Sequence, residues 1–111
     1  MPTVNIFYSD KTLSKQLDDL VKPLKECVAQ QLTCGDIRLN SNEVSIRFIT
    51  TSGSGLLAPL EVEITAASFK ERVEKQDAIC LNIQNFILEK INSLKDVKVW
   101  LILSELGHSW E

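Results

Sequence analysis

The strongest constraint on this chain is a strand–helix–strand pattern that occurs twice within its 111 residues. Alternating polar and apolar residues indicate strands, because successive side chains of a strand point to opposite faces of a sheet. A helix separates the two strands of each half, and strands joined in this way are expected to be parallel. The predicted strands cover residues 3–8, 44–49, 60–65 and 97–103.

Apolar residues at steps of three and four predict one helix over residues 13–32 and a longer one over residues 69–94. Pro23 interrupts the first helix and is expected to kink or break it, because proline donates no backbone hydrogen bond. Ser68, with Glu71 three residues later, is expected to begin the second helix as a capping box.

The two halves also resemble each other in sequence. The segment that begins at Pro2 has the same pattern as the segment that begins at Pro59. We therefore expect residues 1–111 to form a single α/β domain of two similar halves, roughly 1–55 and 56–111. Its duplicated β-α-β units are predicted to make one four-stranded sheet with two helices on one face.

Neighbouring strand residues that are both apolar indicate a sheet that is covered on both faces. Such neighbours are Ile6 and Phe7, Phe48 and Ile49, and the run from 100 to 103. Two helices cover only one face, and 111 residues leave no third layer. Other copies of the chain are therefore expected to pack on the second face. The alternative is a monomeric α/β sandwich with a few surface aromatic residues.

The composition is that of a globular protein, with 44% hydrophobic residues, 24% charged residues and a net charge of −3. A weakly acidic chain without a basic block is not expected to bind nucleic acid. No apolar run approaches the roughly 20 residues of a membrane span, so no membrane association is expected. The first residues lack the basic and long apolar regions of a signal peptide, and the expected location is the cytoplasm.

The cysteine and histidine content argues against a metal site. The three cysteines, Cys27, Cys34 and Cys80, have no C-x-x-C spacing, and His108 is the one histidine. Cys27 and Cys80 lie on apolar helical stripes, where we expect them to pack as small hydrophobic side chains. Cys34, beside Gly35 in a predicted loop, is expected to be partly exposed.

Three short segments resemble those of a known superfamily. Pro2 opens a strand that leads into Tyr8-Ser9-Asp10, residues 44–50 read Val-Ser-Ile-Arg-Phe-Ile-Thr, and residues 103–109 follow the last strand. Together with the doubled strand–helix–strand unit, these segments resemble the tautomerase superfamily. Its members include 4-oxalocrotonate tautomerase, 5-carboxymethyl-2-hydroxymuconate isomerase and macrophage migration inhibitory factor.

The resemblance implies that the initiator methionine is removed and that the secondary amine of Pro2 is the general base. A neutral amine removes a proton next to a carbonyl and returns it elsewhere, which isomerises a keto–enol pair or a double bond. The resemblance also implies a small, carboxylate-bearing substrate, a homotrimer and no cofactor. The alternative for Pro2 is a proline that merely begins a strand.

Five further residues are candidates for substrate binding. The resemblance places Arg38 and Arg47 there, since arginine grips a carboxylate through two parallel hydrogen bonds. Lys98 is the counterpart of Arg47 in the second half, and Tyr8 and Trp110 are aromatic candidates for the pocket wall. The alternatives are solvated or salt-bridged charges and aromatic residues that only pack.

Two other functions compete with an isomerase. One is a catalytically inactive protein of the same fold that acts by binding a ligand or a protein. The other is a ferredoxin-like regulatory domain that shares only the order of the elements. A retained Met1 would exclude the isomerase, because the nitrogen of Pro2 would then belong to an amide and would not be basic.

Overall fold

The computed structural model describes residues 2–35, 37–52 and 55–105. Each predicted strand is present within two residues of its expected bounds. The strands are β1 Thr3–Tyr8, β2 Ser45–Thr50, β3 Leu60–Ala67 and β4 Val97–Ser104. The helices are α1 Ser14–Leu32, α2 Lys70–Glu74 and α3 Gln76–Lys90, and two short 3-10 turns cover Lys11–Leu13 and Ser41–Glu43.

The strands form one sheet in the order β2-β1-β3-β4. β1 is parallel to β2, β3 is parallel to β4, and the two central strands, β1 and β3, are antiparallel. The predicted duplicated β-α-β architecture is therefore confirmed. The ferredoxin-like alternative is wrong, because that fold splits each β-α-β unit with an inserted strand, whereas here the two strands of each unit are neighbours.

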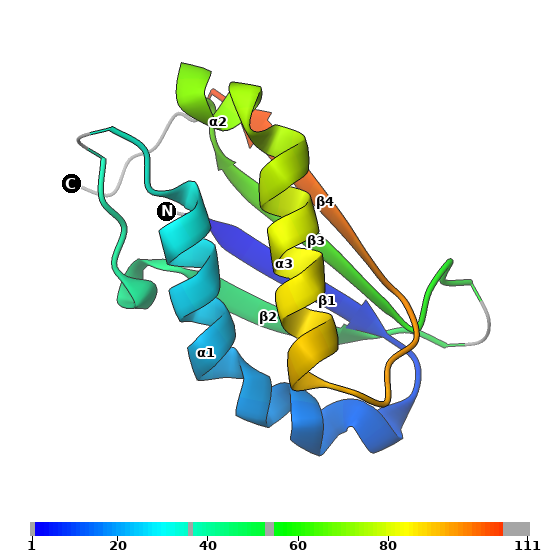
Figure 1. Ribbon diagram of the computed structural model, residues 1–111. Helices are drawn as coiled ribbons and strands as arrows, with labels where there is room; N and C mark the ends of the chain where they lie inside the picture. The colour runs from blue at the N-terminus through cyan, green and yellow to red at the C-terminus, as the bar shows by residue number, and fades with distance from the viewer. Residues whose placement is uncertain (1, 36, 53–54, 106–111) are drawn as a thin grey trace.

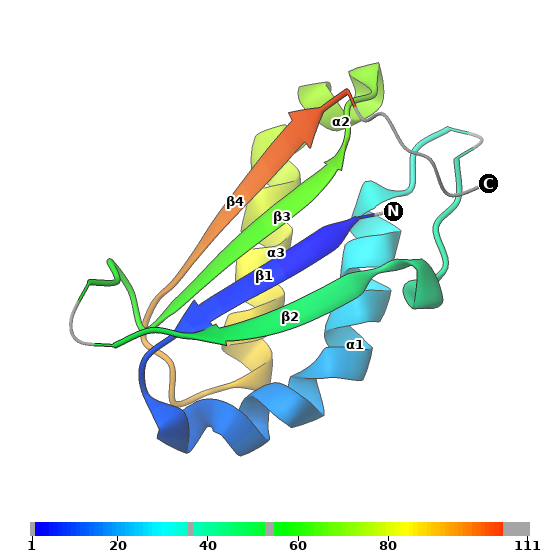
Figure 2. The same ribbon diagram turned by 180° about the vertical axis from the view of Figure 1, so that it is seen from behind.

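Both long helices pack on the same face of the sheet (Figure 1), and the opposite face carries no helix (Figure 2). Strand residues that face the helices are fully buried, as with Val4 and Ile6 on β1 and Val62 and Ile64 on β3. They meet a stripe of buried aliphatic residues from α1 and α3. The core consequently lies between the sheet and the helix layer.

Pro23 does not break the first helix. α1 runs from Ser14 to Leu32 with the proline inside it, and Leu20 and Leu24 on either side are buried in the core. The lost hydrogen bond is therefore tolerated within a helix whose apolar face is fully packed.

The prediction of a single long second helix is wrong. The segment forms α2 and α3, which meet at Lys75, where φ is −105° and ψ is 11°. The expected capping box does not form, because Phe69 is the N-cap residue and the backbone N–H of Ser68 donates to the carbonyl of Ser104 instead. Phe69 and Val73 point outward, and the buried residue of α2 is Arg72.

The face without helices exposes apolar side chains, as the paired apolar residues predict. Ile49 on β2 and Trp100 and Ile102 on β4 are each more than a third exposed. In the described part of the chain, no second layer covers them. We use the name open face for this side of the sheet.

A pair of substitutions on α3 tests the position of the core. Ile83 is fully buried, and Ile83→Ala is expected to lower the free energy of unfolding by about 2–5 kcal/mol because it leaves a cavity. Leu81 is 54% exposed, and Leu81→Ala is expected to change that free energy by no more than about 0.5 kcal/mol. Chemical denaturation at one protein concentration measures both, and equal losses would contradict the assignment.

Candidate functional site

Pro2 is buried where β1 begins. Its carbonyl accepts a hydrogen bond of 3.1 Å from the backbone N–H of Ser45, the first residue of β2. Thr3, the next residue, lies opposite Thr65 near the end of the antiparallel strand β3. The start of β1 is thus enclosed by the start of one neighbouring strand and the end of the other.

Arg72 is buried at this same end of the sheet, with only 4% of its surface exposed. Its Nε donates to the carbonyl of Leu32, the last residue of α1, at 2.9 Å. Its Nη1 donates to the carbonyl of Ala67, the last residue of β3, also at 2.9 Å. The guanidinium also lies over the ring of Phe69, 4.8 Å from its centroid. One side chain therefore links α1, β3 and α2.

The surroundings of Arg72 explain how a cation is accommodated there. Burial lowers the pKa of the guanidinium, and the nearby side chain of Cys34 acts in the opposite direction. The carbonyl of Leu32 belongs to the C-terminal turn of a helix, which carries partial negative charge. Arginine stays protonated at any ordinary pH, so this end of the sheet holds a permanent positive charge.

Cys34 is buried, which corrects the expectation of partial exposure. Its backbone exchanges two hydrogen bonds with Ile37, at 3.0 and 2.8 Å, and this bridge folds the segment after α1 against the molecule. Arg38 follows the bridge and is exposed. The structure consequently places Arg38 on the surface at the end where Pro2 and Arg72 are buried.

Three of the other predicted substrate-binding residues do not lie at this end. Tyr8 lies at the opposite end of β1, is buried, and packs edge-on against Phe48 with ring centroids 6.5 Å apart. Lys98, at the start of β4, forms a salt bridge of 3.3 Å with Asp96. Arg47 is exposed in the middle of β2 on the open face, and Trp110 lies outside the described residues.

Arg72 is the functional candidate that the sequence did not reveal. In the sequence it is one of several charged residues at the start of a helix, and such residues usually lie in solvent. The one local sign is its spacing of three from Phe69, which allows an arginine to stack on an aromatic ring. Its two carbonyl partners come from other elements, one of them 40 positions away.

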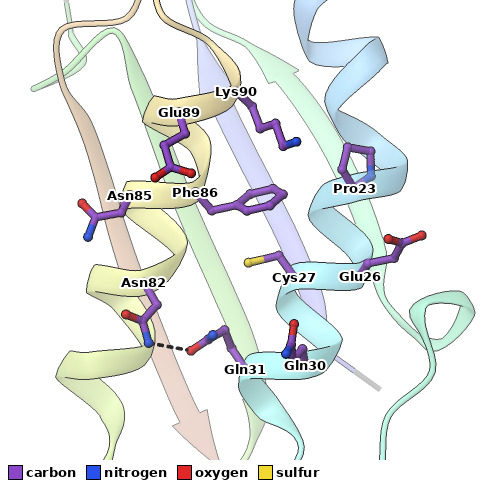
Figure 3. A pocket seen from close by; sticks show the side chains of 10 residues that line it. All are labelled: Pro23, Glu26, Cys27, Gln30, Gln31, Asn82, Asn85, Phe86, Glu89 and Lys90. Carbon is purple, nitrogen blue, oxygen red and sulfur yellow. Dashed lines mark hydrogen bonds between the residues drawn. The ribbon is translucent and has the colours of Figure 1, made fainter.

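A groove of about 430 Å³ also lies between α1 and α3 (Figure 3). Phe86 and Cys27 point into the space between the helices, and the side-chain amide of Asn82 donates to that of Gln31 at 3.0 Å. Burial raises the pKa of the Cys27 thiol, which disfavours the reactive thiolate. Neither Pro2 nor Arg72 lines this groove, and we assign no chemistry to it.

Within residues 2–35, 37–52 and 55–105, no three histidine, cysteine, aspartate or glutamate side chains are grouped as metal ligands. In the same ranges, no helix has the length and apolar character needed to cross a bilayer.

No protein-family model and no curated protein matches the sequence. Solved structures match it in fold. A macrophage migration inhibitory factor-like protein from Entamoeba histolytica superposes with a TM-score of 0.69 over 97% of this chain and 95% of that chain, at 10% identity. A fused 4-OT described as a symmetric trimer gives 0.71 over 96% and 91%, at 15% identity. This chain has the tautomerase fold.

A protein of unknown function from Vibrio cholerae has a similar fold, with a TM-score of 0.70 over 99% of this chain and 83% of that chain, at 16% identity. Another fused 4-OT is described as an asymmetric trimer and gives a TM-score of 0.68. The tautomerase fold therefore accommodates almost the whole of this chain.

The role of Arg72 in holding the tautomerase fold together can be measured. Arg72→Met is expected to lower the free energy of unfolding by about 1–3 kcal/mol, because the carbonyls of Leu32 and Ala67 lose their donor. Lys75→Met, at an exposed position three residues later, is expected to stay within about 0.5 kcal/mol of wild type. Urea denaturation compares them, and a loss in Arg72→Met no larger than in Lys75→Met would contradict this role.

Proposed function

We propose that this chain is a cofactor-independent tautomerase or isomerase that moves a proton alpha to a carbonyl, with Pro2 as general base after removal of Met1. The observation that carries the proposal is the burial of Pro2 at the end of the sheet where Arg72 is also buried. The tautomerase fold supports the same conclusion. The residue directly after Met1 is small, which suits removal of the methionine.

The surroundings of Pro2 suit a base. A secondary amine accepts a proton only while it is neutral, and burial and a neighbouring cation both disfavour the protonated form. Val4 and Leu32 are fully buried near this end of the sheet and supply the apolar part of the environment. Arg72, buried at the same end of the sheet, is the cation that we propose for this role.

In the proposed reaction, the nitrogen of Pro2 takes a proton from the carbon beside the substrate carbonyl. The electron pair of the broken C–H bond moves into the carbonyl group and leaves a negative charge on its oxygen. A cation or hydrogen-bond donor stabilises that charge, and Arg72 is the buried cation at this end. The protonated amine then returns the proton to the oxygen or to another carbon, so the reaction consumes no co-reactant.

The substrate class is a small carbonyl compound that carries a carboxylate. Arg38, exposed at the same end as Pro2, is the residue that we propose to bind the carboxylate. Roles for Arg47, Lys98, Tyr8 and Trp110 in substrate binding stay predictions, because the chain positions the first three away from Pro2 and the fourth lies outside the described residues.

We also propose that the chain works as a homotrimer in the cytoplasm. The exposed apolar residues of the open face support self-association, since helices cover only the other side of the sheet. Two fused 4-OT structures of the same fold are described as trimers, which supports an assembly of three copies.

The first prediction from this proposal concerns Pro2 itself. Intact-mass spectrometry of protein from the native host is expected to show a chain shorter by one methionine. Tautomerisation of phenylpyruvate or 2-hydroxymuconate is expected to be measurable and to fall at least about 100-fold in Pro2→Ala, because the positioned base is lost. Retention of Met1, or full activity in Pro2→Ala, would overturn the proposal in favour of an inactive binding protein of this fold.

The second prediction concerns the pH dependence that Arg72 imposes. Activity is expected to fall on the acid side as the amine becomes protonated. Without the cation the amine binds its proton more tightly, so in Arg72→Met this acid limb is expected to move to higher pH by about one unit or more. Arg72→Lys keeps the charge and is expected to leave the limb near its wild-type position.

Initial rates measured across the pH range, on variants shown by circular dichroism to be folded, test this prediction. An acid limb at the same pH in wild type, Arg72→Lys and Arg72→Met would show that Arg72 only supports the fold. A limb that moves in both variants would show that the charge is not the cause.

A further inference from the structure

One cross-strand row of the open face combines charges of both signs with an amide. Arg47 on β2 lies opposite Asn5 on β1, and Asn5 lies opposite Glu63 on β3. Trp100 on β4 lies opposite Glu63 and completes the row. Residues in register project from the same face of a sheet, so these four side chains, which we call the polar row, stand side by side.

The polar row has an unsatisfied acceptor next to its basic end. The Oδ1 atom of Asn5 is buried and accepts no hydrogen bond from the described residues. Buried acceptors in folded proteins nearly always have a donor, because leaving one unpaired is destabilising. The atom has almost no exposed surface, so a donor from another molecule reaches it only if the side chains around it move.

The charges on either side of Asn5 are not paired with each other. Arg47 is exposed and Glu63 is half-buried, and the one salt bridge found among the described residues joins Lys98 to Asp96. Two strand spacings, roughly 10 Å, separate the backbones of Arg47 and Glu63. The β2 edge of the open face is consequently basic and its centre acidic.

Apolar side chains surround these charges. Ile49 is 37% exposed, Trp100 43% and Ile102 45%, and both long helices pack on the other side of the sheet. This surface is apolar, with a basic edge and an acidic centre. It is complementary to a second copy that is shifted so that the basic edge of one copy meets the acidic centre of the other. This complementarity favours a second copy of the chain as the occupant.

We infer that Arg47 of one copy lies over the polar row of the next copy, where its guanidinium pairs with the carboxylate of Glu63. The inference rests on the self-association in the proposed function and specifies its contact. The two patches that meet are different, so the contact is head-to-tail, and such contacts form a ring when the rotation between copies closes. In this contact, Arg47 holds the assembly together.

Exchange of the two charges tests the contact. Arg47→Glu and Glu63→Arg each bring like charges together, so the dissociation constant of the assembly is expected to rise at least about tenfold in either variant. The double variant R47E/E63R restores opposite charges and is expected to return to within about threefold of wild type. Lys22→Glu makes the same change of charge on an exposed position of α1 and is the control. Light scattering over a dilution series measures all four.

The outcomes separate this inference from the proposed function. A wild-type chain that is monomeric at every concentration would overturn the self-association and this contact together. If Arg47→Glu and Glu63→Arg raise the dissociation constant of the assembly no more than Lys22→Glu does, the contact is overturned and the self-association stands. If a single variant unfolds, as circular dichroism would show, recovery in the double variant supports the pairing and failure to recover contradicts it. Loss of activity in Pro2→Ala bears on the chemistry and not on this contact.

Discussion

The antiparallel pairing of β1 with β3 is the contact on which the rest of the structure depends. It joins two β-α-β halves into one sheet and brings the start of β1 beside the end of β3. Pro2, from the first half, and Arg72, from the second, thereby come to the same end of the molecule. The same pairing sets Asn5 opposite Glu63, so it also arranges the charges of the open face. A single pairing between halves therefore determines both the candidate site and the candidate interface.

The strands could be predicted because their signal is local. Alternation on β3 is strict, with buried residues at Leu60, Val62, Ile64 and Ala66, and the pattern needs no knowledge of the rest of the chain.

The second helix was predicted less well, because its start depends on a distant partner. Ser68 has the right spacing for a capping box, but its backbone N–H pairs with Ser104 at the far end of the sequence. That contact draws the segment toward β4, and the chain forms two helices where the periodicity predicts one.

The candidate site could be predicted only in part, for the same reason. Pro2 was identified from its position after the initiator methionine and from the resemblance of the strand that it opens. Arg72 could not be identified from the sequence, because a charged side chain is buried only where other groups satisfy its hydrogen bonds. The carbonyl groups that do so belong to the ends of α1 and β3. Cys34 was expected to be partly exposed on the basis of its loop, whereas the backbone bridge to Ile37 and the contact with Arg72 enclose it. Sequence patterns report the periodicity of a segment and do not report which other segments reach it.

The likeness of the two halves has a consequence for stoichiometry. Pro59 precedes β3 as Pro2 precedes β1, so the chain has two prolines in corresponding places. Pro59, however, follows Ala58 in the chain, so its nitrogen is an amide whose lone pair is delocalised, and its side chain is exposed where that of Pro2 is buried. Only the first half can present a secondary amine. Duplication of the fold therefore does not duplicate the chemistry, and a base of this kind is limited to one in each chain, however many copies assemble.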